Sequence, residues 1–199
     1  MLIRSFVRPA LAGLLIVATS LPAAAHVGHG ETSGFVHGFL HPIGGLDHML
    51  AMVSVGMLAA LLGGRALWMV PASFMAMMAV GAGLAMAGFD LPFVELGISL
   101  SVIALGVAVA LQLPLPMIGA MAFVGFFAVF HGFAHGAEMP VDASGASYGA
   151  GFLLATALLH LAGLVTGLVL SRSVSKADVI SRVAGGAIAI AGIALVTSG

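Results

Sequence analysis

The chain has no cysteine, a single lysine and few charged side chains of either sign. Without Cys there are no thiolate metal ligands, no disulfides and no Cys nucleophile. Lys176 is the only lysine and no Gly-Lys-Ser/Thr loop is present, so ATP-driven chemistry on this chain is not expected. The formal net charge of -1 gives no basic surface for nucleic acid, and no nucleic-acid partner is predicted.

Most of the chain consists of long apolar segments. Hydrophobic residues make up 61% of it, and its mean hydropathy is +1.22. Turns and charges divide it into about six apolar segments, each near the ~20 residues that cross a bilayer as a helix. The sequence therefore predicts an all-α polytopic membrane protein with six transmembrane helices embedded in a lipid bilayer. The segments lie near 40–62, 66–87, 91–111, 115–136, 147–171 and 178–197.

The N-terminus has the pattern of a secretory signal peptide. Arg4 and Arg8 form its basic region, residues 11–21 its apolar core, and Ala23-Ala24-Ala25 a small-residue cleavage site. We expect residues 1–25 to be the signal and 26–199 the six-helix domain, with an uncleaved first membrane helix as the alternative. Cleavage after Ala25 would leave His26 as the first mature residue.

The charges between the apolar segments predict an orientation. Basic residues concentrate in alternate turns, which by the positive-inside rule face the cytoplasm, and the opposite turns carry acidic residues only. The mature N-terminus is therefore expected on the outer side of the membrane. The basic residues are Arg65, Arg172, Lys176 and Arg182, and the acidic ones are Asp90, Glu138 and Asp142.

A first cluster of ionisable residues begins the first apolar segment. On a straight helix His41 and His48 share a face but lie ~10 Å apart along the axis, too far to ligate one ion. Pro42 and the glycines at 44–45 each weaken a helix and favour a local break that could bring the two imidazoles together. Asp47 is either a ligand itself or a carboxylate that orients a ligand imidazole.

A second cluster ends the fourth segment. His131, His135 and Glu138 follow i, i+4, i+7 spacing, which stacks them on one helical face. Two imidazoles one turn apart with a carboxylate beyond them favour a borderline divalent cation. The predicted topology puts this cluster at the same outer level as the first, and Glu95 enters the third helix from that side. Glu95 is either a third wall of the site or an interfacial side chain that reaches water.

Four further histidines are weaker candidates. His26 and His29 would lie in the mature N-terminus, and His37 precedes the first cluster by one turn. His160 is deep in the fifth segment, where it is either a packed histidine that bonds to a neighbouring helix or a relay for metal or proton.

The two clusters resemble the signatures of a known family. The string His41-Pro42-Ile43-Gly44-Gly45-Leu46-Asp47-His48 resembles the His-Pro-x-x-Gly-x-Asp-His signature of the HupE/UreJ family of bacterial secondary metal permeases. The block from Phe130 to Glu138 is similar to that family's His-Gly-x-Ala-His-Gly-x-Glu element. Both blocks, the signal peptide and the number of segments match, so the resemblance extends over essentially the whole chain.

The resemblance implies a permease and not an enzyme, with Ni(II) or Co(II) as the transported ion and no prosthetic group. It also implies a multi-pass protein of the bacterial inner membrane, with the mature N-terminus in the periplasm. By matching position it implies roles for His41, Asp47, His48, Glu95, His135 and Glu138. Residue chemistry alone does not choose between nickel, cobalt and zinc. Two other functions stay open on the residues: a haem-binding electron carrier and an intramembrane metal-dependent hydrolase. Energy coupling and assembly into a homo-oligomer are open as well.

Overall fold

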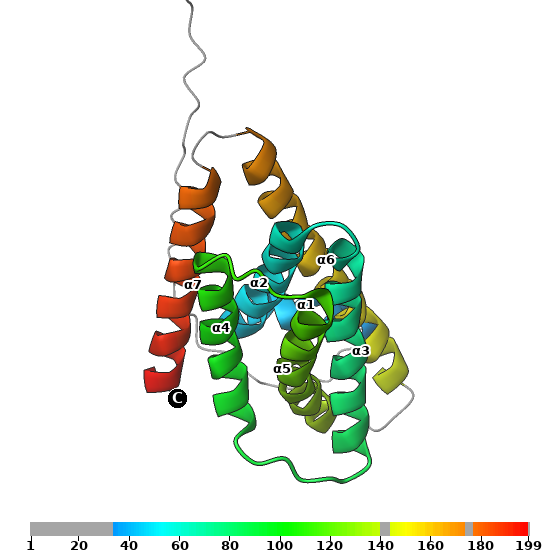
Figure 1. The fold of residues 1–199 in the computed structure, drawn as a ribbon. Coiled ribbons are helices and arrows are strands. Elements are labelled where there is room, and N and C mark those ends of the chain that lie inside the picture. Colours follow the sequence, from blue (N-terminus) through cyan, green and yellow to red (C-terminus); the bar gives the residue numbers. More distant parts are fainter. Residues whose placement is uncertain (1–33, 140–143, 174–176, 199) are drawn as a thin grey trace, which may run out of the picture. The chain divides into compact units, whose positions relative to one another are not determined.

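The described part of the chain, residues 34–139, 144–173 and 177–198, folds into helices joined by turns and short loops in the computed structural model (Figure 1). It contains seven helices and no strand. The expected signal peptide, His26 and His29 lie outside the described residues. The helices are α1 (Gly34–Gly44), α2 (Leu46–Leu62), α3 (Ala66–Met86), α4 (Val94–Ala110), α5 (Met117–Glu138), α6 (Ser144–Ser173) and α7 (Ala177–Ser198).

Each apolar segment predicted from the sequence coincides with a helix or, in the first segment, with a broken pair. Four helices, α3, α5, α6 and α7, are long and apolar enough to cross a membrane. The pair α1 and α2 passes the same test jointly but bends by 80° at Gly45, and α4 is a shorter apolar helix of 17 residues. The described residues therefore contain four candidate membrane spans, or five if the bent pair is one span, which fits a multi-pass membrane protein.

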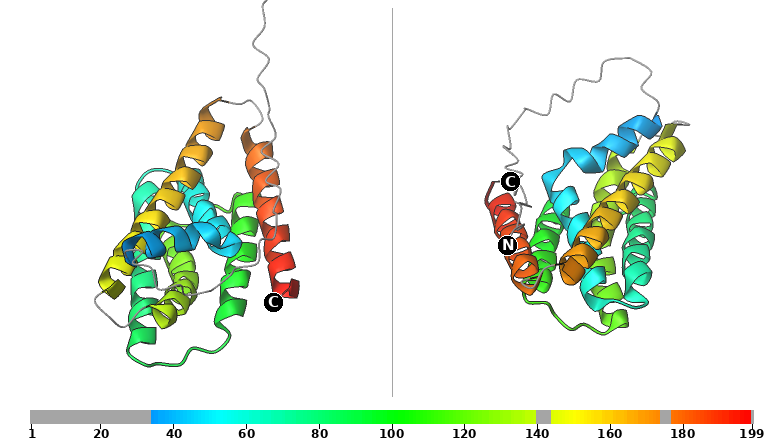
Figure 2. Two further views of the ribbon diagram at one scale, coloured as in Figure 1. Left: turned by 180° about the vertical axis from the view of Figure 1, so that it is seen from behind. Right: turned by 90° about the horizontal axis from the view of Figure 1, so that it is seen from above.

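The break at Gly45 changes the direction of the chain within the first segment. Helix α1 runs across the bundle and α2 runs along it (Figure 2). Gly45 itself is extended, with φ -94° and ψ 120°, and no side chain caps α2 there. Pro42 and Gly44–Gly45 predicted a local break in this segment. In the structure Pro42 lies inside α1, and only Gly45 leaves the helical conformation.

Glycines let the helices pack at backbone contact. On α5, Gly132 faces the backbone of Met78 and Gly136 faces Ala82, so α5 runs parallel to α3. The spacing of these two glycines fits the close helix packing that lipid-embedded bundles need.

The other main helix pairs pack in the same way. Gly163 of α6 faces Val53 of α2 and Gly167 faces Ala60, which makes α6 parallel to α2. In contrast, α4 and α7 are antiparallel, because Gly192 lies against Ile103 whereas Gly185 lies against Ala110.

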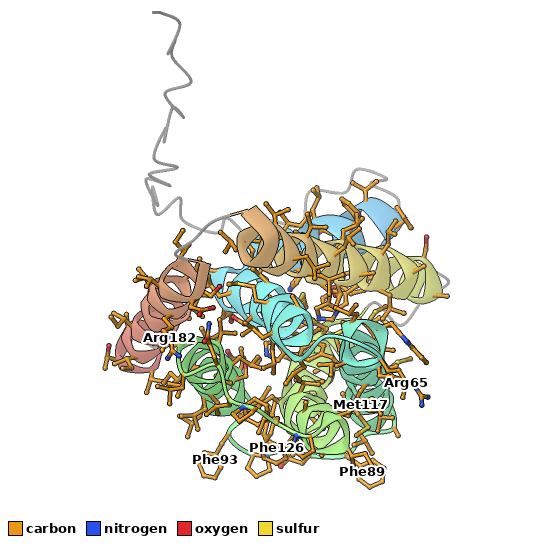
Figure 3. The ribbon with its side chains drawn as sticks, turned by 45° about the horizontal axis from the view of Figure 1, so that its top comes forward. Arg65, Phe89, Phe93, Met117, Phe126 and Arg182 are labelled. Carbon is orange, nitrogen blue, oxygen red and sulfur yellow. The ribbon has the colours of Figure 1, made fainter. Side chains whose placement is uncertain are left out.

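Apolar side chains cover the outside of the helices, and polar ones lie inside. Phe93 and Phe126 point away from the neighbouring helices, at 76% and 60% exposure (Figure 3). The buried set includes Phe74 and Leu58 but also polar side chains, among them four histidines. An apolar exterior around a partly polar interior is what a lipid environment requires. The buried histidines are His48, His131, His135 and His160.

The α3–α5 contact yields a stability prediction. A Cβ at Gly132 would overlap the Met78 carbonyl oxygen, so Gly132→Ala must push α5 away from α3. We expect a loss of about 1–3 kcal/mol, the usual effect of overpacking. Gly83→Ala on α3 is the matched control, because nothing lies within 4 Å of its Cβ. The thermal unfolding midpoint in detergent should fall for the first variant only, and equal midpoints would contradict this packing.

Candidate metal centre

The α1–α2 break brings His41 and His48 to the same place. His41 is in the last turn of α1 and His48 in the first turn of α2. Both rings lie against His135 of α5, with ring-centroid distances of 4.7 Å and 4.4 Å. The two histidine clusters, far apart in the sequence, therefore meet in space.

Asp47 holds the imidazole of His48. One carboxylate oxygen, Oδ1, accepts hydrogen bonds from the His48 backbone N–H and from His48 Nδ1, both at 2.8 Å. Since an ionised carboxylate only accepts, Nδ1 carries the proton and His48 Nε2 keeps its lone pair. Asp47 thus orients the His48 imidazole, which is the arrangement expected for the second of the two roles that the sequence left open. A Cβ at Gly45 would lie 2.8 Å from that carboxylate oxygen, so a larger residue there must displace the carboxylate.

His135 presents a different nitrogen on each side of its ring. Its Nε2 lies 2.5 Å from His48 Nε2, and its Nδ1 lies 3.9 Å from a carboxylate oxygen of Glu138. Because His48 Nε2 has a lone pair, His135 Nε2 donates the hydrogen in this contact. The lone pair of His135 is therefore on Nδ1, which has no hydrogen-bond partner among the described residues and faces Glu138.

Three side chains form a compact ligand set, which we call the rim group: His41, His135 and Glu138. One ligand atom from each lies within 4.8 Å of the others. His41 Nε2 is 3.5 Å from Glu138 Oε2. Two ligand atoms bound at ~2.1 Å to one ion lie about 3–4 Å apart. The two spacings to Glu138, 3.5 Å and 3.9 Å, fit a shared cation, and a bound ion would draw the two imidazoles closer together. The Glu138 side chain is 62% exposed and His135 is buried, which gives the group one open side.

His131 lies one turn deeper on α5 and is fully buried at 0% exposure. Its Nε2 is 2.8 Å from the Ser101 hydroxyl on α4, and its ring centroid is 4.8 Å from that of His48. It is not part of the rim group. The i, i+4 spacing thus places His131 and His135 on one face, but they have different surroundings.

The structure separates three other candidates from the rim group. Glu95 is exposed in the first turn of α4 and lines a hollow between α4 and α7. His37 is exposed on α1 and contacts Tyr148 edge-on at 6.2 Å. His160 is buried on α6 with neither ring nitrogen hydrogen-bonded to a described residue, and it packs edge-on against Phe74 at 5.2 Å.

Sequence reasoning missed the aromatic wall and the serine of this site. Phe152 of α6 lies 4.2 Å from the His135 ring by centroids, and Tyr148 lies 6.1 Å from His41. A cavity of about 210 Å³ beside His135 is otherwise lined by apolar residues and Tyr148 of α3, α5 and α6. Ser101 had one weak signal, a hydroxyl within an otherwise apolar helix.

These features define a class: helical membrane proteins in which imidazole and carboxylate side chains are grouped within an apolar bundle, at spacings suited to a metal ion. Known proteins specify it further. The HupE / UreJ protein family matches residues 14–195, and Protein HupE of Rhizobium leguminosarum bv. viciae is 45% identical over 181 residues, 90% of this chain and 94% of that protein. No solved structure matches.

The chain therefore belongs to the HupE/UreJ family. This is a family of transporters, generally of nickel and cobalt, and not of enzymes, so the hydrolase and haem-carrier alternatives are not favoured.

The contact at Gly45 predicts that alanine substitutions at Gly45 and at Gly44 have different effects on metal affinity. Gly45→Ala would place a methyl group against the Asp47–His48 pair, whereas Gly44→Ala meets nothing within 4 Å. We expect the first variant to weaken Ni(II) or Co(II) binding about 10-fold or more, and the second to change it little, since orienting partners are commonly worth 10–100-fold in metal affinity. Isothermal titration of the purified proteins measures this. Equal affinities for the two variants would show that the pair does not position a ligand.

Proposed function

We propose that the chain is a secondary permease that carries Ni(II) or Co(II) from the periplasm to the cytoplasm. The observation that carries this proposal is the rim group, because it joins α1 to α5 and is open on one side. Its buried member, His135, leads directly to His48 in the interior. Ionisable groups in such positions of a membrane bundle generally mark an ion pathway.

The donor atoms support a borderline divalent ion as the substrate. The rim group offers two imidazole nitrogens and one carboxylate oxygen, and the chain has no thiolate to favour softer ions. Nickel and cobalt both suit this set, and membership of the family supports the same pair. The proposal needs no prosthetic group, since the metal is the cargo.

The directions of the helices support a topology of six spans. In six alternating crossings, the first and fifth spans run the same way, as α2 and α6 do. The second and fourth also run the same way, as α3 and α5 do, while the third and sixth run oppositely, as α4 and α7 do. The pair α1–α2 then counts as one discontinuous span, a device that transporters use to build ion sites. We place the rim group at the periplasmic end, and Arg65 and Arg182 at the cytoplasmic end (Figure 3).

The predicted residues other than His37 and His131 each have a proposed part in this pathway. The rim group receives the ion, and Asp47 orients His48, to which the ion passes next. Glu95 lies in the first turn of α4, where we propose that it attracts cations to the periplasmic face. His26 and His29 would capture metal outside the membrane, and His160 would act as a relay nearer the cytoplasm.

Metal accumulation in cells tests the proposal. His135→Ala removes both the nitrogen that faces Glu138 in the rim group and the nitrogen that contacts His48, so we expect uptake of radiolabelled nickel to fall at least about 10-fold. His37→Ala is the matched control, because His37 is one turn from His41 on the same helix but exposed and outside the rim group. Membrane levels of each variant are measured in parallel. Undiminished uptake of both nickel and cobalt by His135→Ala would refute the proposed pathway.

A further inference from the structure

The hydrogen bonds of Ser101 fix which nitrogen of His131 carries its proton. The Ser101 hydroxyl donates its only hydrogen to the Ile98 carbonyl oxygen, at 2.6 Å. The serine oxygen can then only accept from His131, so the contact at 2.8 Å is a hydrogen bond donated by His131 Nε2. The lone pair of this imidazole therefore lies on Nδ1.

The His131 Nδ1 lone pair is buried and accepts no hydrogen bond from a described residue. His131 is 0% exposed, and its Nδ1 has no hydrogen-bond partner among the described residues. Buried polar atoms are nearly always paired, so an orphan nitrogen in the interior needs an explanation. A neutral imidazole nitrogen with a free lone pair is a ligand ready for a cation.

The rings continue inward from the rim group without a gap. His41 contacts His135 at 4.7 Å, His135 contacts His48 at 4.4 Å, and His48 contacts His131 at 4.8 Å, all as T-shaped pairs. Two imidazoles that bind one ion through nitrogens ~2.1 Å away have ring centroids about 5 Å apart. The spacing of His48 and His131 fits that arrangement, with the ion at His48 Nε2 in place of the hydrogen that His135 Nε2 donates there.

We propose that His48 and His131, the inner pair, form a second position for the transported ion, which it occupies after the rim group. This inference rests on the proposed function and deepens it. The inner pair supplies imidazole nitrogen only, since Asp47 is bonded through the far nitrogen of His48. Imidazole-only sites suit nickel, cobalt, copper and zinc, whereas magnesium and manganese prefer oxygen ligands. The inner pair thus selects borderline ions, and Ser101 is a positioning residue that keeps His131 Nδ1 free.

Full-length protein in liposomes tests the inner pair. His131→Phe keeps the ring but removes both nitrogens, and Ser101→Ala leaves the imidazole but removes its orienting hydroxyl. Ser54→Ala is the matched control, because Ser54 is also fully buried and its hydroxyl has no described partner. Two quantities are measured: the Kd for Ni(II), which reports the rim group, and the rate of Ni(II) transport.

We expect His131→Phe to lower the transport rate at least about 10-fold and Ser101→Ala about 3- to 10-fold, with the Kd of both within about 2-fold of the wild type, since a step after binding is lost. Ser54→Ala should change neither quantity. A transport rate at the wild-type level in His131→Phe overturns the inner pair. So does a loss in Ser101→Ala that comes with an equal change in Kd and a lower unfolding midpoint, because that marks a packing role only. The permease function is tested independently by His135→Ala, and normal transport by that variant would refute it.

Discussion

The turn of the chain at Gly45 is the constraint on which the site depends. A break inside an apolar bundle exposes backbone polar groups that lipid cannot satisfy, so it persists only where the protein itself supplies partners. Asp47 does this by accepting the His48 N–H at the start of α2, where a negative charge is also favoured by the helix dipole. The same oxygen holds the His48 ring. The Asp47 carboxylate thus both stabilises the break and orients the imidazole of His48.

Backbone contacts at glycines hold the helices on either side of the break in position. α1 and α2 both lie against α6, through Gly38 at Tyr148 and Gly163 at Val53, so the two arms of the break share one support. α5, which carries the other ligands, is fixed against α3 at Gly132. The histidines from the two sides therefore meet as a consequence of backbone contacts, and an ion bound between His41 and His135 would link α1 to α5.

Hydropathy and spacing predicted the helices, because both signals are local. The pairing of His135 with Glu138 follows from the helical repeat, and the weakening of the helix near Gly45 follows from residue type. The 80° bend does not, since its size depends on how α1 and α2 dock on α6. Nor could the sequence find the contact between Ser101 and His131, whose partners are 30 residues apart on different helices. The sequence also left Glu95 open between a wall of the site and an interfacial side chain, and in the structure Glu95 lines a hollow together with residues of α7.

The order of the ligands has an electrostatic logic. A divalent ion that leaves water needs compensating charge first, and the exposed Glu138 carboxylate supplies it at the rim group. Further inside, neutral imidazoles replace water as ligands but neutralise no charge, so an ion there is held less strongly. Asp47 moderates this through His48, to which it is bonded. A pathway must bind an ion well enough to admit it and weakly enough to release it. The rim group, with imidazole and carboxylate ligands, satisfies the first condition. The inner pair, with imidazole alone, satisfies the second, because an ion bound more weakly in the interior leaves that position more easily.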